Sequence, residues 1–202
     1  MDHSVRAADL SCVGRLHGRA GLAELTMNTL RAITLALHLV APGYARNGYP
    51  ALLARLEREH GIDAILMIAD VDGETRWNPS LINETRWGQM VGLAQIRDRN
   101  FEACADDGPE CEAVRARLLK PRWNLIQAFR LFAWAKNYCT KRGYPSAVHW
   151  LQMPRGFDAV RHTTCGHRNG KALPIPKGIT WLMKRRRELL NSKSSTKRAK
   201  ER

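Results

Sequence analysis

Residues 64–73 are apolar on nearly every side of the helix that they would form. A helix of this composition lies buried at the centre of a domain, because no side of it favours contact with water. Asp63 precedes the run and is placed to cap its first turn, while Glu74 follows the run directly. We therefore predict a buried central helix that ends at a carboxylate.

The segments around this run carry helical periodicity or helix-boundary residues, whereas no alternating β-rich run of five residues occurs. A starting proline or a closing glycine marks some of their ends. We predict helices over Tyr49–His60, residues 110–119, residues 121 to about 142 and residues 179–190, with shorter turns or helices over residues 144–151 and 156–162. The predicted fold class is therefore mainly α.

A polar stretch follows Glu74. Residues 75–88 show no consistent period, and Asn78-Pro79 interrupts them. Long loops in compact domains tend to have functional roles. The sequence predicts a long functional loop directly after the central helix.

The chain has a formal net charge of +14, and half of this excess lies near its end. Residues 184–202 include nine Lys or Arg and two Glu. Such a surplus indicates an anionic partner, which could be nucleic acid, an anionic membrane surface or a cell-wall polymer. We predict a basic tail over residues 183–202, which is either an electrostatic anchor or a solvated, disordered end.

The N-terminal region has the composition of a leader. Residues 1–26 show no sustained period, and the segment from Met27 has the basic start, apolar stretch and small residues of a secretory signal peptide. An amphipathic N-terminal helix is the alternative for that segment. We predict a leader over residues 1–45 and a folded domain over residues 46–182. No transmembrane segment is predicted, because no apolar run reaches the roughly 18 residues required.

Cleavage after residue 45 would leave four cysteines, Cys104, Cys111, Cys139 and Cys165. An even number of cysteines fits an oxidising compartment, in which disulfides form. Metal ligation by these residues is disfavoured, because the chain has no Cys-x-x-Cys pair. We therefore predict an exported protein that uses neither a metal nor another cofactor.

The position of Glu74 favours the protonated form of its side chain. A carboxylate at the C-terminal end of a helix faces the negative end of the helix dipole, and the apolar neighbours Val71 and Trp77 disfavour ionisation further. A general acid that protonates a glycosidic oxygen near neutral pH needs such an environment. Glu74 is therefore the candidate catalytic residue, and a surface Glu at a helix end is the alternative.

Two motifs beside Glu74 resemble those of the soluble lytic transglycosylase family, in the lysozyme-like superfamily. The family has a helix ending in Glu-Ser-x-Phe-Asn-Pro, a loop, and then Gly-Leu-Met-Gln-Ile. This chain has Glu-Thr-Arg-Trp-Asn-Pro over residues 74–79 and Gly-Leu-Ala-Gln-Ile over residues 92–96, in the same order and at nearly the same spacing. The resemblance covers roughly residues 49 to 160 and implies a lysozyme-like helical domain.

The resemblance implies a lytic transglycosylase that cleaves the β-1,4 bond between N-acetylmuramic acid and N-acetylglucosamine in peptidoglycan and forms a 1,6-anhydromuramyl product. Glu74 would act first as acid and then as base, so no second catalytic carboxylate would be needed. Residues implied to bind substrate or to support the site are Thr75, Asn78, Gly92, Leu93, Gln95, Asn124 and Gln152.

The implied partners are peptidoglycan glycan strands and, through the basic tail, anionic polymers of the cell envelope. The implied location is the periplasm or the cell envelope. A phage-encoded lysis or virion enzyme is the alternative origin.

The chain departs from the family after Tyr144, where a tyrosine of the family helps to orient the catalytic Glu. Residues 147–157 contain no tyrosine, although His149 and Gln152 could donate a hydrogen bond there. A second Glu-Thr-Arg-Trp begins at Glu84, which makes Glu84 the rival carboxylate. The alternatives are therefore a hydrolase, or a domain that binds peptidoglycan without cutting it. A less favoured alternative is a protein that binds nucleic acid through charge alone.

Overall fold

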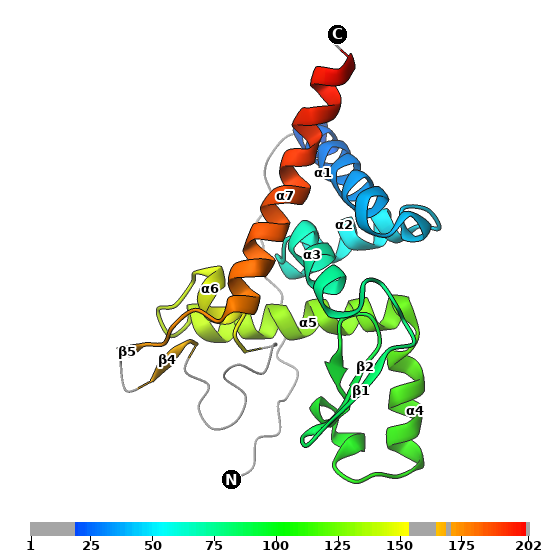
Figure 1. Cartoon of the computed structure of the whole chain (residues 1–202), viewed down its shortest axis with the longest axis vertical. Coiled ribbons are helices and arrows are strands. Elements are labelled where there is room, and N and C mark those ends of the chain that lie inside the picture. The colour runs from blue at the N-terminus through cyan, green and yellow to red at the C-terminus, as the bar shows by residue number, and fades with distance from the viewer. Residues whose placement is uncertain (1–18, 154–164, 169–170, 201–202) are drawn as a thin grey trace.

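The computed structural model describes residues 19–153, 165–168 and 171–200, and most of these residues are helical (Figure 1). The helices are α1 (Arg19–Val40), α2 (Tyr49–His60), α3 (Ala64–Thr75), α4 (Pro109–Leu118), α5 (Pro121–Thr140), α6 (Ala147–Trp150) and α7 (Lys177–Lys200). Short 3-10 turns are η1 (Pro42–Tyr44), η2 (Asp98–Asn100) and η3 (Glu102–Cys104). The prediction of a mainly α fold is confirmed.

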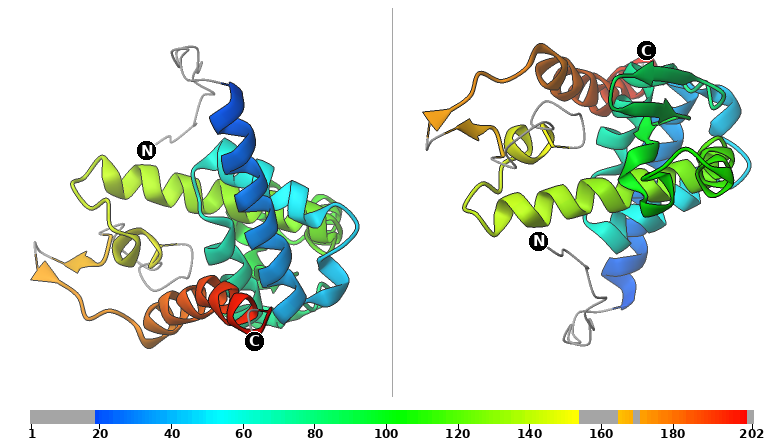
Figure 2. Two further views of the ribbon diagram at one scale, coloured as in Figure 1. Left: turned by 90° about the horizontal axis from the view of Figure 1, so that it is seen from above. Right: turned by 90° about the horizontal axis from the view of Figure 1, so that it is seen from below.

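Helix α3 is the buried central helix that the sequence predicts. Its residues from Ala64 to Ala69 are all buried, and Val71 is fully buried. Asp63 caps the helix, since its Oδ1 accepts a hydrogen bond from the backbone N–H of Leu66 at 2.9 Å. Figures 1 and 2 show α2 and α3 between α1 and α5, so the central helix is covered from both sides.

Helix α1 lies within residues 1–45, the predicted leader, and shares the core of the protein. Ile33, Ala36 and Leu37 are fully buried, and α1 packs against α2, α3 and α7. Residues 1–18 lie outside the described residues. The part of the predicted leader that the structure describes is therefore packed against the helices of the domain.

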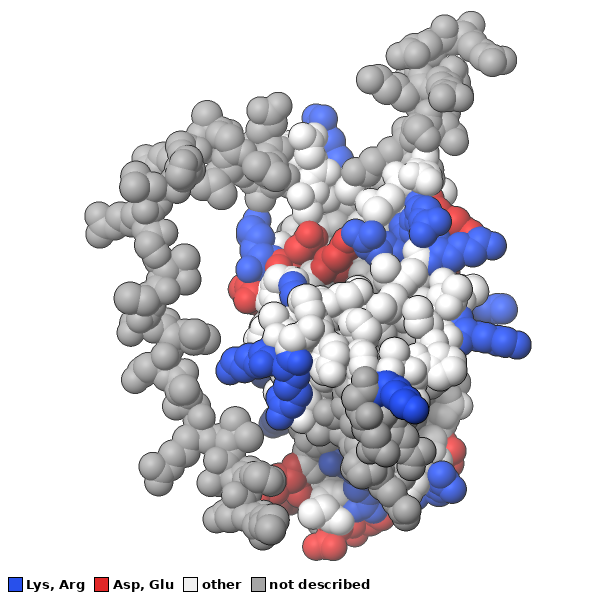
Figure 3. Space-filling model, turned by 90° about the vertical axis from the view of Figure 1, so that its left-hand side faces the viewer, with Lys and Arg blue, Asp and Glu red and all other residues white. Residues whose placement is uncertain are grey.

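Helix α7 runs through residue 183, where the basic tail was predicted to begin. Leu182 and Leu189 are buried, and Arg186 donates from Nε to Oδ2 of Asp63 at 2.9 Å. Arg185 donates from Nε to Oδ2 of Asp72 at 2.9 Å. Part of the basic charge is thus used in ion pairs with Asp72 of α3 and with Asp63, the cap of that helix. Figure 3 shows Lys and Arg mixed with Asp and Glu on one face of the molecule.

A small antiparallel sheet follows α3, with strands β1 (Ile82–Thr85), β2 (Gly88–Val91) and β3 (Ile96–Arg97) in the order β1-β2-β3. The prediction of a loop over residues 75–88 is therefore wrong for its second half. All four residues of β1 are exposed, so the strand depends on backbone pairing with β2 rather than on a buried face. An exposed strand of four residues leaves no apolar alternation for the sequence to reveal.

Two disulfides join the four cysteines that the export hypothesis retains. Cys104 pairs with Cys111, and Cys139 pairs with Cys165. The second bond fastens the end of α5 to the segment before the two-stranded sheet of β4 (His167–Arg168) and β5 (Lys171–Ala172). The helix or turn predicted over residues 156–162 lies outside the described residues. Among the described helices, none combines the length and apolar composition that a bilayer-spanning segment requires.

Candidate active site

Glu74 is the last residue but one of α3, and its half-buried side chain lines a pocket of about 80 Å³. The pocket lies between α3, the three-stranded sheet and α5. Its lining comprises Asp70, Glu74, Met90, residues 94–97, Ala128, Leu131 and Phe132. The pocket therefore brings together Glu74 and Gln95, which the sequence singles out, with Asp70 and Arg97, which it does not.

The end of α3 is fastened directly to the loop formed by residues 92–95. Thr75 is buried, and its hydroxyl donates to the backbone carbonyl of Leu93 at 2.9 Å and to that of Val71 at 3.3 Å. Thr75 follows Glu74 immediately, so these bonds fix the backbone on which Glu74 stands. The role that the structure gives to Thr75 is to support the site, because its hydroxyl is used inside the protein.

Asn124, at the start of α5, holds the other side of the same loop. It is fully buried, and its Oδ1 accepts from the backbone N–H of Ala94 at 2.8 Å. Its Nδ2 donates to the carbonyls of Val91 at 2.9 Å and Leu118 at 2.8 Å. Every polar atom of this amide has a partner, so Asn124 supports the loop and does not face a ligand.

Gly92 is required by this close packing. Its φ is +74°, a conformation that glycine adopts at no steric cost. A Cβ placed there would lie 2.3 Å from the carbonyl oxygen of Leu118 and 2.5 Å from Nδ2 of Asn124. Leu93 is fully buried beside it. Gly92 and Leu93 therefore shape the loop through packing.

Gln95 lines the pocket, but its amide is engaged by the neighbouring backbone and by Asn83. Its Oε1 accepts from Nδ2 of Asn83 at 2.6 Å, while Nε2 donates to the carbonyls of Gly92 at 2.9 Å and Leu81 at 3.1 Å. Only 4% of the residue is exposed. Gln95 thus ties the first strand of the sheet to the loop at the floor of the pocket.

The sheet presents one row of side chains towards this pocket. Its register places Asn83 opposite Met90, and Met90 opposite Arg97. Residues that are directly opposite on neighbouring strands point to the same face of a sheet. Met90 and Arg97 line the pocket, and Asn83 bonds Gln95. The sequence alone did not reveal Arg97, because this row exists only once the register is known.

Glu84, the rival carboxylate, lies outside this pocket. It is exposed on β1, and its Oε1 accepts from Nε2 of Gln89 at 2.6 Å. Successive residues of a strand point to opposite faces, so Glu84 points away from the face that carries Asn83. The structure places one of the two Glu-Thr-Arg-Trp carboxylates in the pocket and the other in solvent.

The remaining predicted residues, Asn78 and Gln152, lie outside the pocket. Asn78 is exposed, and its Oδ1 accepts from the N–H of Ser80 at 3.0 Å. Gln152 is buried and donates to the carbonyl of Val148 at 2.8 Å. Neither belongs to the pocket lining that the structure describes, and no tyrosine of the described residues belongs to it either.

An aromatic contact covers the back of the turn that follows Glu74. Trp77 is buried, and its ring centroid lies 4.9 Å from that of Tyr44. Burial, and then the neighbouring Tyr49, raises the pKa of the Tyr44 phenol. Tyr44 therefore stays neutral beside Trp77 in the physiological range, and the contact is one of packing rather than of charge.

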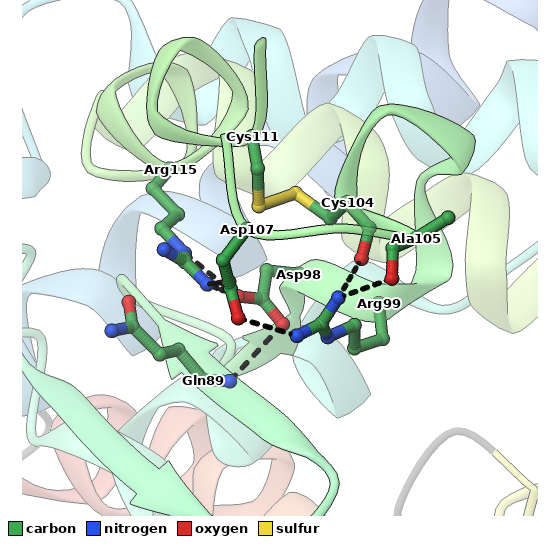
Figure 4. Close-up of a disulfide and its surroundings, with 8 residues drawn as sticks. All are labelled: Gln89, Asp98, Arg99, Cys104, Ala105, Asp107, Cys111 and Arg115. Carbon is green, nitrogen blue, oxygen red and sulfur yellow. Dashed lines mark hydrogen bonds and ion pairs between the residues drawn. A yellow bond between two sulfur atoms is a disulfide. The ribbon is translucent and has the colours of Figure 1, made fainter. Parts of the chain in front are cut away.

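Behind the sheet lies a second polar cluster, drawn in Figure 4. Asp98 is fully buried and accepts from the N–H of Gln89 at 3.0 Å and from Nε of Arg115 at 2.7 Å. Arg115 also pairs with Asp107 at 2.5 Å. The disulfide of Cys104 and Cys111 closes the same region.

Asp98, Cys104 and Cys111 lie close enough together to suggest a metal site. A metal would need free thiolates, and the disulfide consumes both of them. This cluster therefore fastens α4 to the sheet and does not serve as a metal centre.

Taken together, the pocket offers a carboxyl group at the end of a buried helix, a hydrogen-bonded polar loop and a guanidinium. This set of groups can transfer a proton to and from a bound ligand and can hold an oxygen acceptor of that ligand. Comparison with family models, with curated proteins and with solved structures finds no match to this chain.

Proposed function

We propose that the chain is a peptidoglycan lytic transglycosylase with Glu74 as its catalytic acid and base. The observation that carries this proposal is the position of Glu74, at the C-terminal end of a buried helix and inside a pocket whose loop is clamped by Thr75 and Asn124. Glu74 and residues 94–96, which belong to the two motifs that carry the family resemblance, line this pocket.

In the proposed reaction the acid form of Glu74 protonates the glycosidic oxygen between N-acetylmuramic acid and N-acetylglucosamine. The bond from the muramyl anomeric carbon to that oxygen breaks, and the resulting carboxylate accepts the proton of the muramyl 6-hydroxyl. The 6-oxygen then bonds to the anomeric carbon and closes a 1,6-anhydro ring. Glu74 is thereby returned to its acid form, and water is not the nucleophile.

The helix supports the acid form of Glu74 at the start of this cycle. The last carbonyls of α3 carry partial negative charge, which disfavours a carboxylate at the same end. Glu84 lacks this environment, because it lies on an exposed strand. The contrast supports Glu74 rather than Glu84 as the catalytic carboxylate.

Export to the periplasm or envelope belongs to the same proposal. The two disulfides support it, since such bonds persist mainly in oxidising compartments. The exposed Lys184 and Arg187 of α7 support contact with anionic envelope polymers.

The test is to digest purified peptidoglycan sacculi and to identify the products by mass spectrometry. We expect 1,6-anhydromuropeptides from the wild type and a loss of about 10²- to 10⁴-fold in rate for Glu74→Gln, as removal of a general acid–base group predicts. Glu84→Gln is the matched control, because it removes an exposed carboxylate from a repeat of the same sequence, and it should keep the wild-type rate.

Each other outcome contradicts the proposal in a defined way. Products with only reducing ends would indicate a hydrolase. Binding to sacculi without products would indicate a non-catalytic domain. A rate that falls in Glu84→Gln but not in Glu74→Gln would show that Glu84, and not Glu74, is the catalytic carboxylate.

A further inference from the structure

Arg97 lines the pocket beside Glu74 and has no partner of its own. In the described part of the chain the side chain of Arg97 forms no hydrogen bond or ion pair, and its Nε is buried without an acceptor. The neighbouring arginines differ, because Arg99 and Arg115 both pair with Asp107. A buried donor that lacks an acceptor costs free energy, and a ligand that supplied an acceptor to Nε would remove this cost.

The register of the sheet explains why Arg97 faces the pocket. Arg97 lies opposite Met90, which lines the same pocket, so the two side chains share one face of the sheet. Its neighbours in sequence, Ile96 and Asp98, are 3% and 0% exposed, so the backbone is anchored on both sides of Arg97. Asp98 is further held by Arg115 and by the N–H of Gln89. The backbone that carries Arg97 is therefore fixed, and no side chain of the described residues bonds its guanidinium.

A guanidinium presents a planar set of N–H donors that suits a carboxylate or an acyl oxygen. In peptidoglycan, the lactyl ether group on muramic acid carries such oxygens and is the group that distinguishes muramic acid from glucosamine. Where the strand has no peptide, the lactyl group ends in a carboxylate. Where a peptide stem is attached, it ends in an amide carbonyl.

We propose that Arg97 binds the lactyl group of N-acetylmuramic acid and thereby selects which sugar occupies the side of the pocket next to Glu74. This inference rests on the proposed function, since it takes peptidoglycan as the substrate. Arg97 is a positioning residue in this scheme. It neither gives nor takes a proton, and it orients the muramyl ring whose 6-hydroxyl attacks.

Binding is measured in the Glu74→Gln background, so that the ligand is not cut during the titration. Calorimetric titrations use three tetrasaccharide probes, which are peptide-free muramoyl glycan, the same glycan with its peptide stems, and chitotetraose, which has no lactyl group. Adding Arg97→Gln should lower the affinity for both muramoyl ligands by about tenfold or more, as loss of a charged hydrogen bond predicts. The affinity for chitotetraose should stay the same.

The two muramoyl probes separate the sources of the acceptor. A peptide-free strand offers a full negative charge, so added salt should weaken its binding more than that of the stem-bearing strand. Arg97→Lys keeps the charge without the planar guanidinium and should give an intermediate loss of affinity for the muramoyl ligands. It replaces Arg97→Gln in the test if that variant does not fold. Arg86→Gln is the charge-matched control, because Arg86 is exposed and stacks on Trp87 at 4.7 Å.

An equal loss of affinity for the muramoyl ligands and for chitotetraose would overturn the inference. So would an unchanged affinity for all three probes, or a failure of every probe to bind the protein that still has Arg97. The proposed function fails separately. If the wild type gives no 1,6-anhydro product while muramoyl binding depends on Arg97, only the chemistry is wrong. If 1,6-anhydro products form and Arg97→Gln leaves the KM for muramoyl glycan unchanged, only the inference is wrong.

Discussion

The two walls of the pocket are held together by different kinds of interaction. The helical wall, by which we mean α3 together with α1, α2 and α7 packed around it, has a continuous apolar core in which Ile33, Leu37, Leu53 and Met67 are fully buried. The hairpin lobe, which we define as residues 82–118, adds Val91, Leu93, Ile96 and Leu118 to that core but is held in addition by the buried Asp98 with its hydrogen bonds and by a disulfide. Glu74 comes from the first wall and Arg97 from the second.

This difference indicates that the two walls respond to different perturbations. Apolar packing is cooperative over the whole domain, so a defect in it lowers the global free energy of unfolding. A small lobe held by a few polar bonds and a covalent link can open locally while the rest stays folded. We expect the acid side of the site to be rigid and the ligand-selecting side to be the adjustable one.

The largest effect should follow from a cavity in the helical wall. Leu53→Ala on α2 should lower the global free energy of unfolding by about 2–5 kcal/mol, because it removes a fully buried side chain. Urea denaturation followed by circular dichroism measures this loss. Leu39→Ala is the control, since Leu39 is 53% exposed, and it should change stability little. A loss below about 1 kcal/mol for Leu53→Ala would contradict a tightly packed helical wall.

An intermediate and local effect should follow from removing the disulfide of the hairpin lobe. The double change Cys104→Ser and Cys111→Ser opens a short covalent loop. From the gain in chain entropy of the unfolded state, we expect a loss of stability of about 2–3 kcal/mol. Hydrogen exchange should speed up at the amides of residues 88–98 and stay slow in α3. The double change Cys139→Ser and Cys165→Ser is the matched control, and it should leave the lobe protected. Faster exchange in α3 would show that the two walls are not independent.

The smallest effect should come from acid acting on the same lobe. The hydrogen bond from Arg115 holds the pKa of the Asp107 carboxyl below its ordinary value of 3.8. Asp107 therefore stabilises the folded lobe above pH 3.8, and this contribution is lost as the pH falls through the lowered pKa. Asp107→Asn should lower the Tm slightly at neutral pH and not at all below the lowered pKa.

The adjacent Asp106→Asn serves as the control for this pH dependence, because Asp106 is exposed and makes no ion pair in the described part of the chain. It should leave the Tm unchanged at both pH values. A Tm difference for Asp107→Asn that persists in acid would show that the side chain acts through packing and not through its charge.

The helical wall could be predicted from the sequence because its information is local. The apolar residues of α3 repeat around the helix, and the cap at Asp63 and the closing Gly61 are visible without any partner. The position of Glu74 at a helix end follows from the same local pattern. No tertiary contact is needed to find it.

The hairpin lobe could not be predicted, because its strands form through backbone pairing between residues that show no recognisable strand pattern in the sequence. Strand β1 is exposed and short, and the placement of Arg97 beside the pocket depends on its register with Met90. Asn124 illustrates the same limit. The family resemblance singles it out, but its hydrogen bonds to Ala94 and Leu118 exist only in the folded chain.

The double use of Asp63 has a practical consequence for anyone who shortens this protein. One oxygen of its carboxylate caps α3 and the other accepts a hydrogen bond from Arg186. The cap of the central helix is therefore held in place by a residue near the end of the chain. Trimming the chain at residue 183 to remove its basic charge would also remove this brace. A deletion intended to change only solubility would then loosen the helix whose far end carries Glu74.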